Sequence, residues 1–382
     1  MSSLIANPMY NGASNEKRIL IMLSMIRNPP SYEEFENVLK ARLNWPWIIM
    51  QAMHHRTICI LWHTLKSRNL LNLACRSGLG KNWITYCEQL TRGSHKKNRL
   101  WLECLNNTLE HLKKDDIDMV CIKGSGLIGD IYEPELRMLG DIDTLIRTKD
   151  RARISAPLKE LGYQHGVIDP ITNTIKPLSK EKLRFWNFHS KIMPKFTLLT
   201  GKEEVPFVRL AVGFDLFDPG AEYGIGSDIL LDHALQHPRY ENLKVLDSLD
   251  TFVCQCAHVF REATSELFAY ISDSWHLWKF CDLRELLYAY DSEDFRSAAI
   301  ERAALYSVLP VVYFALMHTY AVYGDPLLLD WIETLEALDT PLAKFSRVIS
   351  DEFADALFDP HPIALKTQKP EWSSVIEDGE WW

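Results

Sequence analysis

Apolar residues recur at helical spacing in both outer thirds of the chain, while a central segment alternates as strands do. From about Glu16 to Lys114 the apolar positions repeat every three or four residues, which predicts successive amphipathic helices. The same spacing returns after Pro219-Gly220 and continues to Val322. The pattern therefore predicts an α+β protein with a small strand-rich core between helical regions.

The central segment opens with two short apolar strands. Asp118–Ile122 and Asp143–Arg147 are the predicted strands, with a short helix expected over Gly126–Tyr132. A further helix is expected from Asp150, as its N-cap, to Leu161, where Gly162 follows as a helix-ending residue.

The second half of the core has a hairpin pattern. Phe188–Leu199 and Phe207–Phe217 flank Thr200-Gly-Lys-Glu-Glu204, which predicts two antiparallel strands joined by a turn. We therefore expect four segments: an N-terminal helical region (1–115), a mixed-sheet core (116–218), a C-terminal helical domain (219–365) and a polar tail (366–382).

Amino-acid composition and net charge limit which binding partners and which cellular compartment we expect. The chain has 382 residues, 47% of them hydrophobic, a mean hydropathy of -0.14 and a net charge of -9. This acidic balance argues against non-specific binding to duplex DNA, although a local basic groove that binds tRNA is not excluded. No signal peptide and no apolar run of 18 residues occurs, and the eight cysteines are scattered, so we expect a cytoplasmic protein without a disulfide scaffold or a membrane span.

Two aspartates in the core have the spacing of metal ligands. Asp141 and Asp143 alternate with apolar residues, so both carboxylates are expected on one face of a strand. Their repulsion is relieved by a divalent cation or a proton between them. The alternative interpretation is that Asp141 is a turn residue and Asp143 a carboxylate at a strand edge.

Upstream of these aspartates, Lys123-Gly124-Ser125 lies where a strand meets a helix. Backbone N–H groups and a hydroxyl at such a junction suit phosphate oxygens. Nucleotidyl transfer with two metals needs a third carboxylate on an adjacent strand. Asp215, set among apolar residues, is the best candidate in the sequence.

These residues together resemble a bacterial family of uncharacterised nucleotidyltransferases in the polymerase-beta-like superfamily. The resemblance is sharp from Met119 to Tyr163 and looser through the predicted hairpin. It rests on the following residues: Lys123, Gly124, Ser125, Leu127, Tyr132, Pro134, Arg137, Gly140, Asp141, Asp143, Gly162 and Tyr163. Two positions depart from the wider superfamily pattern: Lys123 precedes the glycine and Thr144 follows the second aspartate, where apolar residues are usual.

The resemblance implies a mixed-sheet nucleotidyltransferase core, magnesium in a two-metal site and a nucleoside triphosphate donor, with ATP the expected one. It also implies that Gly124 and Ser125 bind the triphosphate. The implied metal ligands are Asp141, Asp143 and Asp215.

Some further residues have two interpretations each. Lys123 either neutralises a phosphate or pairs with Asp130 or Glu135. Arg137 either clamps the donor phosphates or braces the loop that carries Asp141.

Three other candidates lie nearer the C-terminus. Lys279 either contacts the nucleotide or forms a helical ion pair with Asp282. We interpret His189 as a structural histidine rather than a site residue, and Cys254-x-Cys256-x-His258 lacks the geometry of a zinc site.

The leading hypothesis is an enzyme that moves a nucleoside monophosphate from a triphosphate to an acceptor and releases pyrophosphate. The acceptor is expected to be a small molecule, a peptide or a protein. One alternative is a nucleotide-binding or partner-binding module without catalysis. Another is a toxin- or antitoxin-type nucleotidyltransferase that acts on tRNA.

Overall fold

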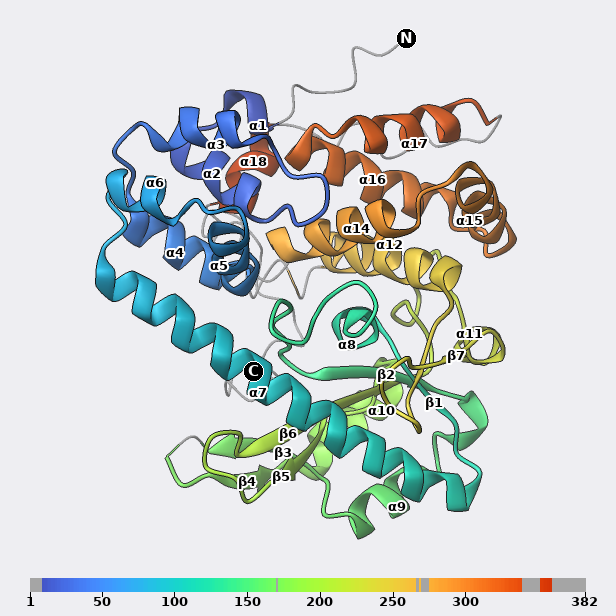
Figure 1. The fold of residues 1–382 in the computed structure, drawn as a ribbon. Coiled ribbons are helices and arrows are strands. Elements are labelled where there is room, and N and C mark those ends of the chain that lie inside the picture. Colours follow the sequence, from blue (N-terminus) through green and yellow to red (C-terminus); the bar gives the residue numbers. More distant parts are fainter. Residues whose placement is uncertain (1–8, 170, 266–267, 269–274, 339–350, 359–382) are drawn as a thin grey trace. The chain divides into compact units, whose positions relative to one another are not determined.

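The computed structural model describes residues 9–338 and 351–358, except 170, 266–267 and 269–274 (Figure 1). The described chain folds into two compact units. Unit 1 takes residues up to 94, residues 135–138 and residues from 255 onward, and unit 2 takes residues 95–134 and 139–254. The N-terminal and C-terminal helices that the sequence separates therefore belong to one unit.

Unit 1 is helical throughout its described residues. Its N-terminal helices are α1 (Met9–Gly12), α2 (Asn15–Leu23), α3 (Tyr32–Leu39), α4 (Trp45–His54), α5 (Ile58–Ser67), α6 (Leu71–Arg76) and the first part of α7 (Lys81–Leu112). Its C-terminal helices are the second part of α12 (Ser248–Thr264), α14 (Leu277–Tyr290), α15 (Glu293–Leu305), α16 (Leu309–Tyr323), α17 (Pro326–Glu336) and α18 (Asp351–Phe358).

Local sequence explains where several of these helices begin. Ser31 and Glu34 form a reciprocal capping box at the start of α3, as the serine and its acidic neighbours predict. Asp325 caps α17, whose first residue is Pro326.

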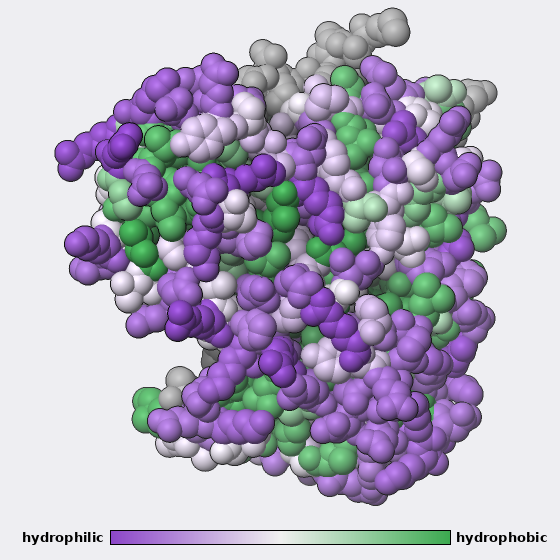
Figure 2. All heavy atoms as spheres, in the orientation of Figure 1, coloured by the Kyte–Doolittle hydropathy of each residue, from purple (hydrophilic) through white to green (hydrophobic). Residues whose placement is uncertain are grey.

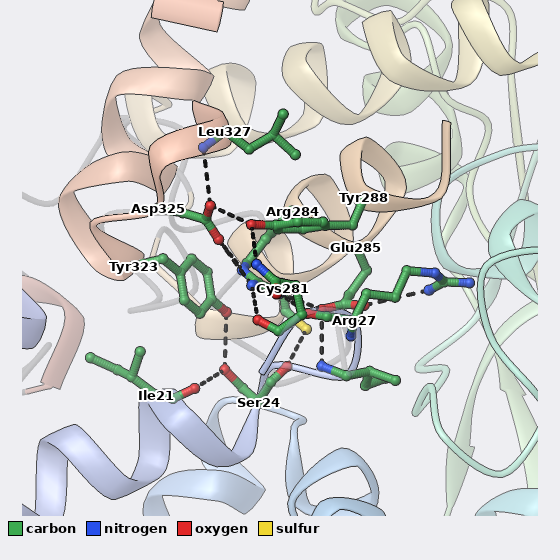
Figure 3. A network of polar contacts seen from close by, with 12 residues as sticks. Ile21, Ser24, Arg27, Cys281, Arg284, Glu285, Tyr288, Tyr323, Asp325 and Leu327 are labelled. Carbon is green, nitrogen blue, oxygen red and sulfur yellow. Dashed lines mark hydrogen bonds and ion pairs between the residues drawn. The ribbon is translucent and has the colours of Figure 1, made fainter. Parts of the chain in front are cut away.

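A buried network of polar contacts joins three helices of unit 1 (Figure 3). Arg284 of α14 bonds to the carboxylates of Asp325 and Glu285, at 2.9 and 2.8 Å. Glu285 also accepts the backbone N–H groups of Ile26 and Arg27, at 3.0 and 2.9 Å. The network therefore ties the end of α2 to α14 and to the start of α17.

Unit 2 is built on an eight-stranded mixed sheet in the order β4-β3-β5-β6-β2-β1-β8-β7. The strands are β1 (Met119–Cys121), β2 (Ile142–Ile146), β3 (Gln164–Asp169), β4 (Thr174–Pro177), β5 (Phe196–Leu199), β6 (Phe207–Gly213), β7 (Leu235–Gln236) and β8 (Lys244–Val245). The other elements are the second part of α7, η1 (Lys113–Asp115), α8 (Lys123–Leu127), η2 (Thr148–Asp150), α9 (Ser155–Glu160), α10 (Lys180–His189), α11 (Ser227–Asp232) and the start of α12.

The second part of α7 covers one face of this sheet (Figure 1). Four leucines on one side of α7 pack into a buried core with alternate residues of β2 and β6. These leucines are Leu102, Leu105, Leu109 and Leu112, and the strand residues include Ile142, Ile146, Leu210 and Val212. Because side chains alternate along a strand, the residues between them point to the opposite face. That opposite face carries Asp143 of β2.

Several predicted elements agree with the structure, and others differ in extent. The α+β class is confirmed, and so is the antiparallel pair β5–β6. The first arm of that hairpin starts at Phe196, however, because α10 occupies the residues up to His189. The short helix spans Lys123–Leu127 rather than Gly126–Tyr132, because the backbone becomes extended at Ile128 and Gly129 follows with a positive φ of 100°.

The predicted segment boundaries also differ from the two units. Residues 95–115 lie with the sheet, since α7 continues into its core, and residues 219–254 add α11, β7 and β8 to the same unit. The predicted polar tail lies outside the described residues.

Polar residues cover most of the visible face, and apolar residues form several separate groups on it (Figure 2). None of the described helices has the length and apolar character needed to cross a membrane.

Candidate functional site

The two predicted aspartates lie together at the start of β2. Asp141 immediately precedes the strand and Asp143 is its second residue, so both point away from the face that α7 covers. Their side chains are 21% and 19% exposed, respectively. They are accessible to a ligand yet partly desolvated.

A lysine approaches each carboxylate from a different element. Lys123 Nζ, at the start of α8, lies 2.9 Å from Asp143 Oδ1. Lys195 Nζ, just before β5, lies 2.8 Å from Asp141 Oδ2. The pairing of Lys123 with Asp143 differs from both carboxylates considered for it in the sequence, Asp130 and Glu135.

A third cation, Arg209, lies on the adjacent strand. β6 runs parallel to β2, with Asp143 opposite Ala211 and Ile142 opposite Leu210. Arg209 is therefore beside Asp141 and on the same face. Burial lowers the pKa of the Arg209 guanidinium, and the negative charge of Asp141 opposes this lowering. Its guanidinium also lies 5.2 Å from the ring centre of Phe207.

The charges in this group shift one another's ionisation. Burial raises the pKa of Asp143, Lys123 opposes that rise, and the charge of Asp141 adds to it. The negative charge of Asp141 raises the pKa of Lys195. The site thus combines two carboxylates with three cations, which we call the Asp141 cluster (Asp141, Asp143, Lys123, Lys195 and Arg209).

Gly124 and Ser125 lie inside the short helix α8, which packs against β1 and β2. The Ser125 hydroxyl lies 2.9 Å from the carbonyl oxygen of Ile122 and 3.1 Å from that of Asp143, and it donates to them. This hydroxyl positions α8, and with it Lys123, against the strand that carries the aspartates. Binding of phosphate by Gly124 and Ser125 stays a prediction.

Asp215 is separated from the other two aspartates along the sheet. It lies four residues beyond Ala211, which is opposite Asp143, a spacing of about 13 Å along an extended strand. Its carboxylate accepts the backbone N–H groups of Phe217 and Ile225, at 3.0 and 3.1 Å. Asp215 follows the neighbouring strand β6, which ends at Gly213, and does not lie at the level of Asp141. The register that decides this level is set by strand pairing that the sequence does not reveal.

Comparison with known proteins identifies the family. The model of a family of uncharacterised nucleotidyltransferases matches residues 41–324 of the 382. The chain belongs to this family. No curated protein and no solved structure matches the chain.

Asp141 and Asp143 are the residues of this nucleotidyltransferase that could hold a magnesium ion. Mg²⁺ commonly binds through one or two carboxylates, water and substrate phosphates, which is what Asp141 and Asp143 can offer on one open face. A second ion needs another carboxylate beside them. The neighbouring strand presents Arg209 and Ala211 there, and Asp215 is at a different level, so these residues do not fit a two-metal site.

Two other predicted site residues belong to unit 1. The Nε of Arg137 donates to both carboxylate oxygens of Asp282, at 2.9 and 3.0 Å, and its guanidinium lies 4.0 Å from the ring centre of Trp278. Lys279 is 2% exposed and forms an ion pair with Glu262. The contacts of both cations are those of structural ion pairs, and their predicted roles at the nucleotide remain predictions.

The candidate zinc ligands and His189 give no additional site. The Nε2 of His258 lies 2.9 Å from Glu262 Oε1, four residues further along α12. Among the described residues, the Cys254-x-Cys256-x-His258 sequence is not part of a group with metal-binding geometry. His189 is the last residue of α10, and its side chain is outside the described part of the structure.

Three histidines of unit 1, His54, His55 and His276, do bring ring nitrogens within 4.8 Å of one another. The Nδ1 of His55 accepts the backbone N–H of Leu277 at 3.3 Å, which places the proton of the neutral ring on Nε2. A metal-bound histidine instead donates from its other nitrogen. This geometry therefore suits packed histidine rings better than a metal centre.

Sequence reasoning missed Lys195 and Arg209. Neither belongs to the Lys-Gly-Ser or the Asp-x-Asp motif, and each reaches the site only through the pairing of β5, β6 and β2. The available indication was a charged residue inside the apolar run Val208–Phe217.

Proposed function

We propose that this nucleotidyltransferase moves a nucleoside monophosphate from a triphosphate, with ATP as the expected donor, to an acceptor and releases pyrophosphate. Asp141 and Asp143 would hold magnesium, which supplies charge neutralisation at the phosphates. The observation that supports this role is that two partly exposed carboxylates and three cations meet on one face of β2 and its neighbouring strands.

The chemistry needs positioning and charge more than covalent help. A nucleophilic atom of the acceptor forms a bond to the α-phosphorus, the bond from that phosphorus to the α–β bridging oxygen breaks, and pyrophosphate leaves with the electron pair. The acceptor proton passes to water. Lysine and arginine side chains fixed on a rigid sheet stabilise the charge that develops on the phosphate oxygens.

The acceptor that we propose is a small molecule or a peptide or protein side chain. The net charge of -9 argues weakly against RNA, although tRNA stays an outcome of the test.

One observation favours a second candidate, a nucleotide-binding module without catalysis. Both carboxylates already have a lysine partner, at 2.9 and 2.8 Å. If these pairs persist in the presence of magnesium, the cations would bind phosphates and no metal would be held.

The test is incubation of the full chain with magnesium, each α-labelled triphosphate and a panel of small-molecule, peptide, protein and tRNA acceptors. We expect pyrophosphate release and transfer of label, both lost in Asp143→Asn. The matched control is Asp169→Asn, because Asp169 lies in the same unit and also pairs with a lysine, Lys176, at 2.9 Å.

Calorimetry of triphosphate binding separates the two candidates. The enzyme predicts binding that strengthens with magnesium, together with turnover. Binding without magnesium and without label transfer to any acceptor would support the non-catalytic module, and no binding would exclude both.

A further inference from the structure

We propose that Arg209, assisted by Lys195, binds the phosphates of the nucleotide in place of a second metal ion, so that the nucleotidyltransferase works with one metal. This inference rests on the proposed function and adds two things to it: a phosphate-binding residue and the number of bound metal ions.

Arg209 occupies the place where a third carboxylate would have to stand. The register pairs Ile142 with Leu210, so the residue beside Asp141 on the neighbouring strand is Arg209. The same strand presents Ala211 beside Asp143. A guanidinium at this position repels a second divalent ion and attracts phosphate oxygens, for which its planar fork of N–H donors is suited.

The guanidinium has donors to spare. Among the residues that the structure describes, the guanidinium of Arg209 forms no hydrogen bond or ion pair, and it lies near the Phe207 ring. Arg284 of unit 1 shows the contrasting case, in which one guanidinium bonds to two carboxylates and to the carbonyl oxygens of Arg27 and Asn28. Half-buried donors next to a candidate metal site are more useful to an anionic ligand than to the fold.

Lys195 is placed to change partner when the metal arrives. Its ammonium lies 2.8 Å from Asp141, and its side chain is 42% exposed, so it can move without repacking the core. A magnesium ion on Asp141 would displace this ammonium by charge repulsion. The register of β5 and β6 pairs Phe196 with Leu210, so the freed cation at the preceding residue lies close to Arg209.

The charge count agrees with an anionic ligand. Three cations and two carboxylates leave the Asp141 cluster with one net positive charge before any metal binds. One magnesium ion increases this to three, which suits a triphosphate.

The experiment counts metal ions in the nucleotide complex. Mn²⁺ replaces magnesium, a non-cleavable α,β-methylene analogue of ATP replaces the donor, and electron paramagnetic resonance measures bound and free Mn²⁺. We expect one Mn²⁺ per chain for the wild type. We expect Arg209→Gln to weaken binding of the analogue by about 10- to 100-fold, since charged hydrogen bonds to phosphate are lost.

Two further variants make the result specific. Arg209→Asp provides the missing carboxylate, and we expect it to bind a second Mn²⁺ in the complex. Lys202→Gln is the matched control, since Lys202 is an exposed cation of the same unit in the β5–β6 turn, and we expect its binding to match the wild type. Circular dichroism confirms that each variant is folded.

Different results overturn different claims. Two Mn²⁺ ions in the wild-type complex would overturn the one-metal proposal and leave nucleotidyl transfer intact. Equal binding of the analogue by folded Arg209→Gln and wild type would remove Arg209 from the site. Absence of nucleotide binding by the wild type would overturn both this inference and the proposed function.

Discussion

Two groups of charged residues, one in each unit, contain similar residues but differ in how deeply their side chains are buried. The Arg284 group of unit 1 (Arg284, Glu285, Asp325 and Arg27) and the Asp141 cluster of unit 2 each contain two carboxylates and at least two cations. In the first, Arg284 and Glu285 are 1% and 0% exposed. In the second, the paired side chains are between 11% and 42% exposed.

The two groups differ in how many of their charges and hydrogen-bond donors are paired within the group. Burial raises the pKa of Glu285, while Arg284 and two backbone N–H groups counter that rise by stabilising its charged form. In unit 2, Arg209 retains unused donors and one positive charge is in excess. A saturated group contributes to one folded conformation, whereas an open, unbalanced group retains the capacity to bind a ligand.

The largest effect should come from breaking the saturated group. Arg284→Ala leaves Glu285 and Asp325 buried without their main partner, and we expect unfolding free energy to fall by about 3–5 kcal/mol. Urea denaturation followed by circular dichroism measures this. A loss below about 1 kcal/mol, which is typical of exposed ion pairs, would contradict the contrast between the groups.

The second-largest effect should be on the rate of nucleotidyl transfer rather than on the unfolding free energy. Lys123→Met removes the cation at Asp143, and we expect label transfer to slow by about 10²-fold because phosphate charge is less well stabilised. Unfolding free energy should change by less than for Arg284→Ala, since Lys123 is part of the more open group. Lys176→Met, which breaks the exposed pair with Asp169, is the control and should leave transfer unchanged.

The third effect tests the buried surroundings of unit 1 through pH. Burial lowers the pKa of His318 to about 4, and the bond from its ring to the Phe314 carbonyl offsets only part of this. Because the unfolded histidine titrates near 6.5, protons favour the unfolded state as pH falls below that value. Stability from this residue is complete above pH 6.5 and decreases down to about pH 4, with about 2 kcal/mol lost at pH 5.

Unfolding measured from pH 8 to pH 4 in wild type and His318→Phe checks this sign. The variant lacks the titrating ring, so its stability should depend less on pH than that of the wild type. Parallel pH profiles for the two proteins would show that His318 does not titrate between the folded and unfolded states as described.

The sequence predicted elements well where local spacing determines them. The helices between Glu16 and Lys114 depend on apolar residues three or four positions apart, so the spacing predicted them. The first arm of the predicted hairpin shows the limit: Phe188 and His189 end the helix α10, and the strand starts only at Phe196. Local spacing did not fix where the helix ends and the strand begins.

The candidate site shows the same limit at longer range. Asp141, Asp143 and Lys123 come from one continuous segment and were found together, whereas Lys195 and Arg209 enter through strand register. Asp215 was predicted as a metal ligand because it is a carboxylate among apolar residues. In the structure its Oδ1 accepts hydrogen bonds from the backbone N–H groups of Phe217 and Ile225. The register between strands depends on contacts between residues far apart in the sequence, and so does the packing of N-terminal against C-terminal helices in unit 1. The spacing of residues along the chain does not predict such contacts.

The smallest effect should be the stability change in Lys195→Gln. This ion pair with Asp141 is as short as the buried contacts of Arg284, at 2.8 Å, but Lys195 is 42% exposed. Water and salt screen such a pair, so we expect unfolding free energy to change by at most about 1 kcal/mol, and by less in high salt. Denaturation at low and high salt, beside Arg284→Ala under the same conditions, measures the difference. A loss for Lys195→Gln as large as that for Arg284→Ala would mean that the Asp141 cluster holds the fold together, and the division between a structural group and a ligand-binding group would fail.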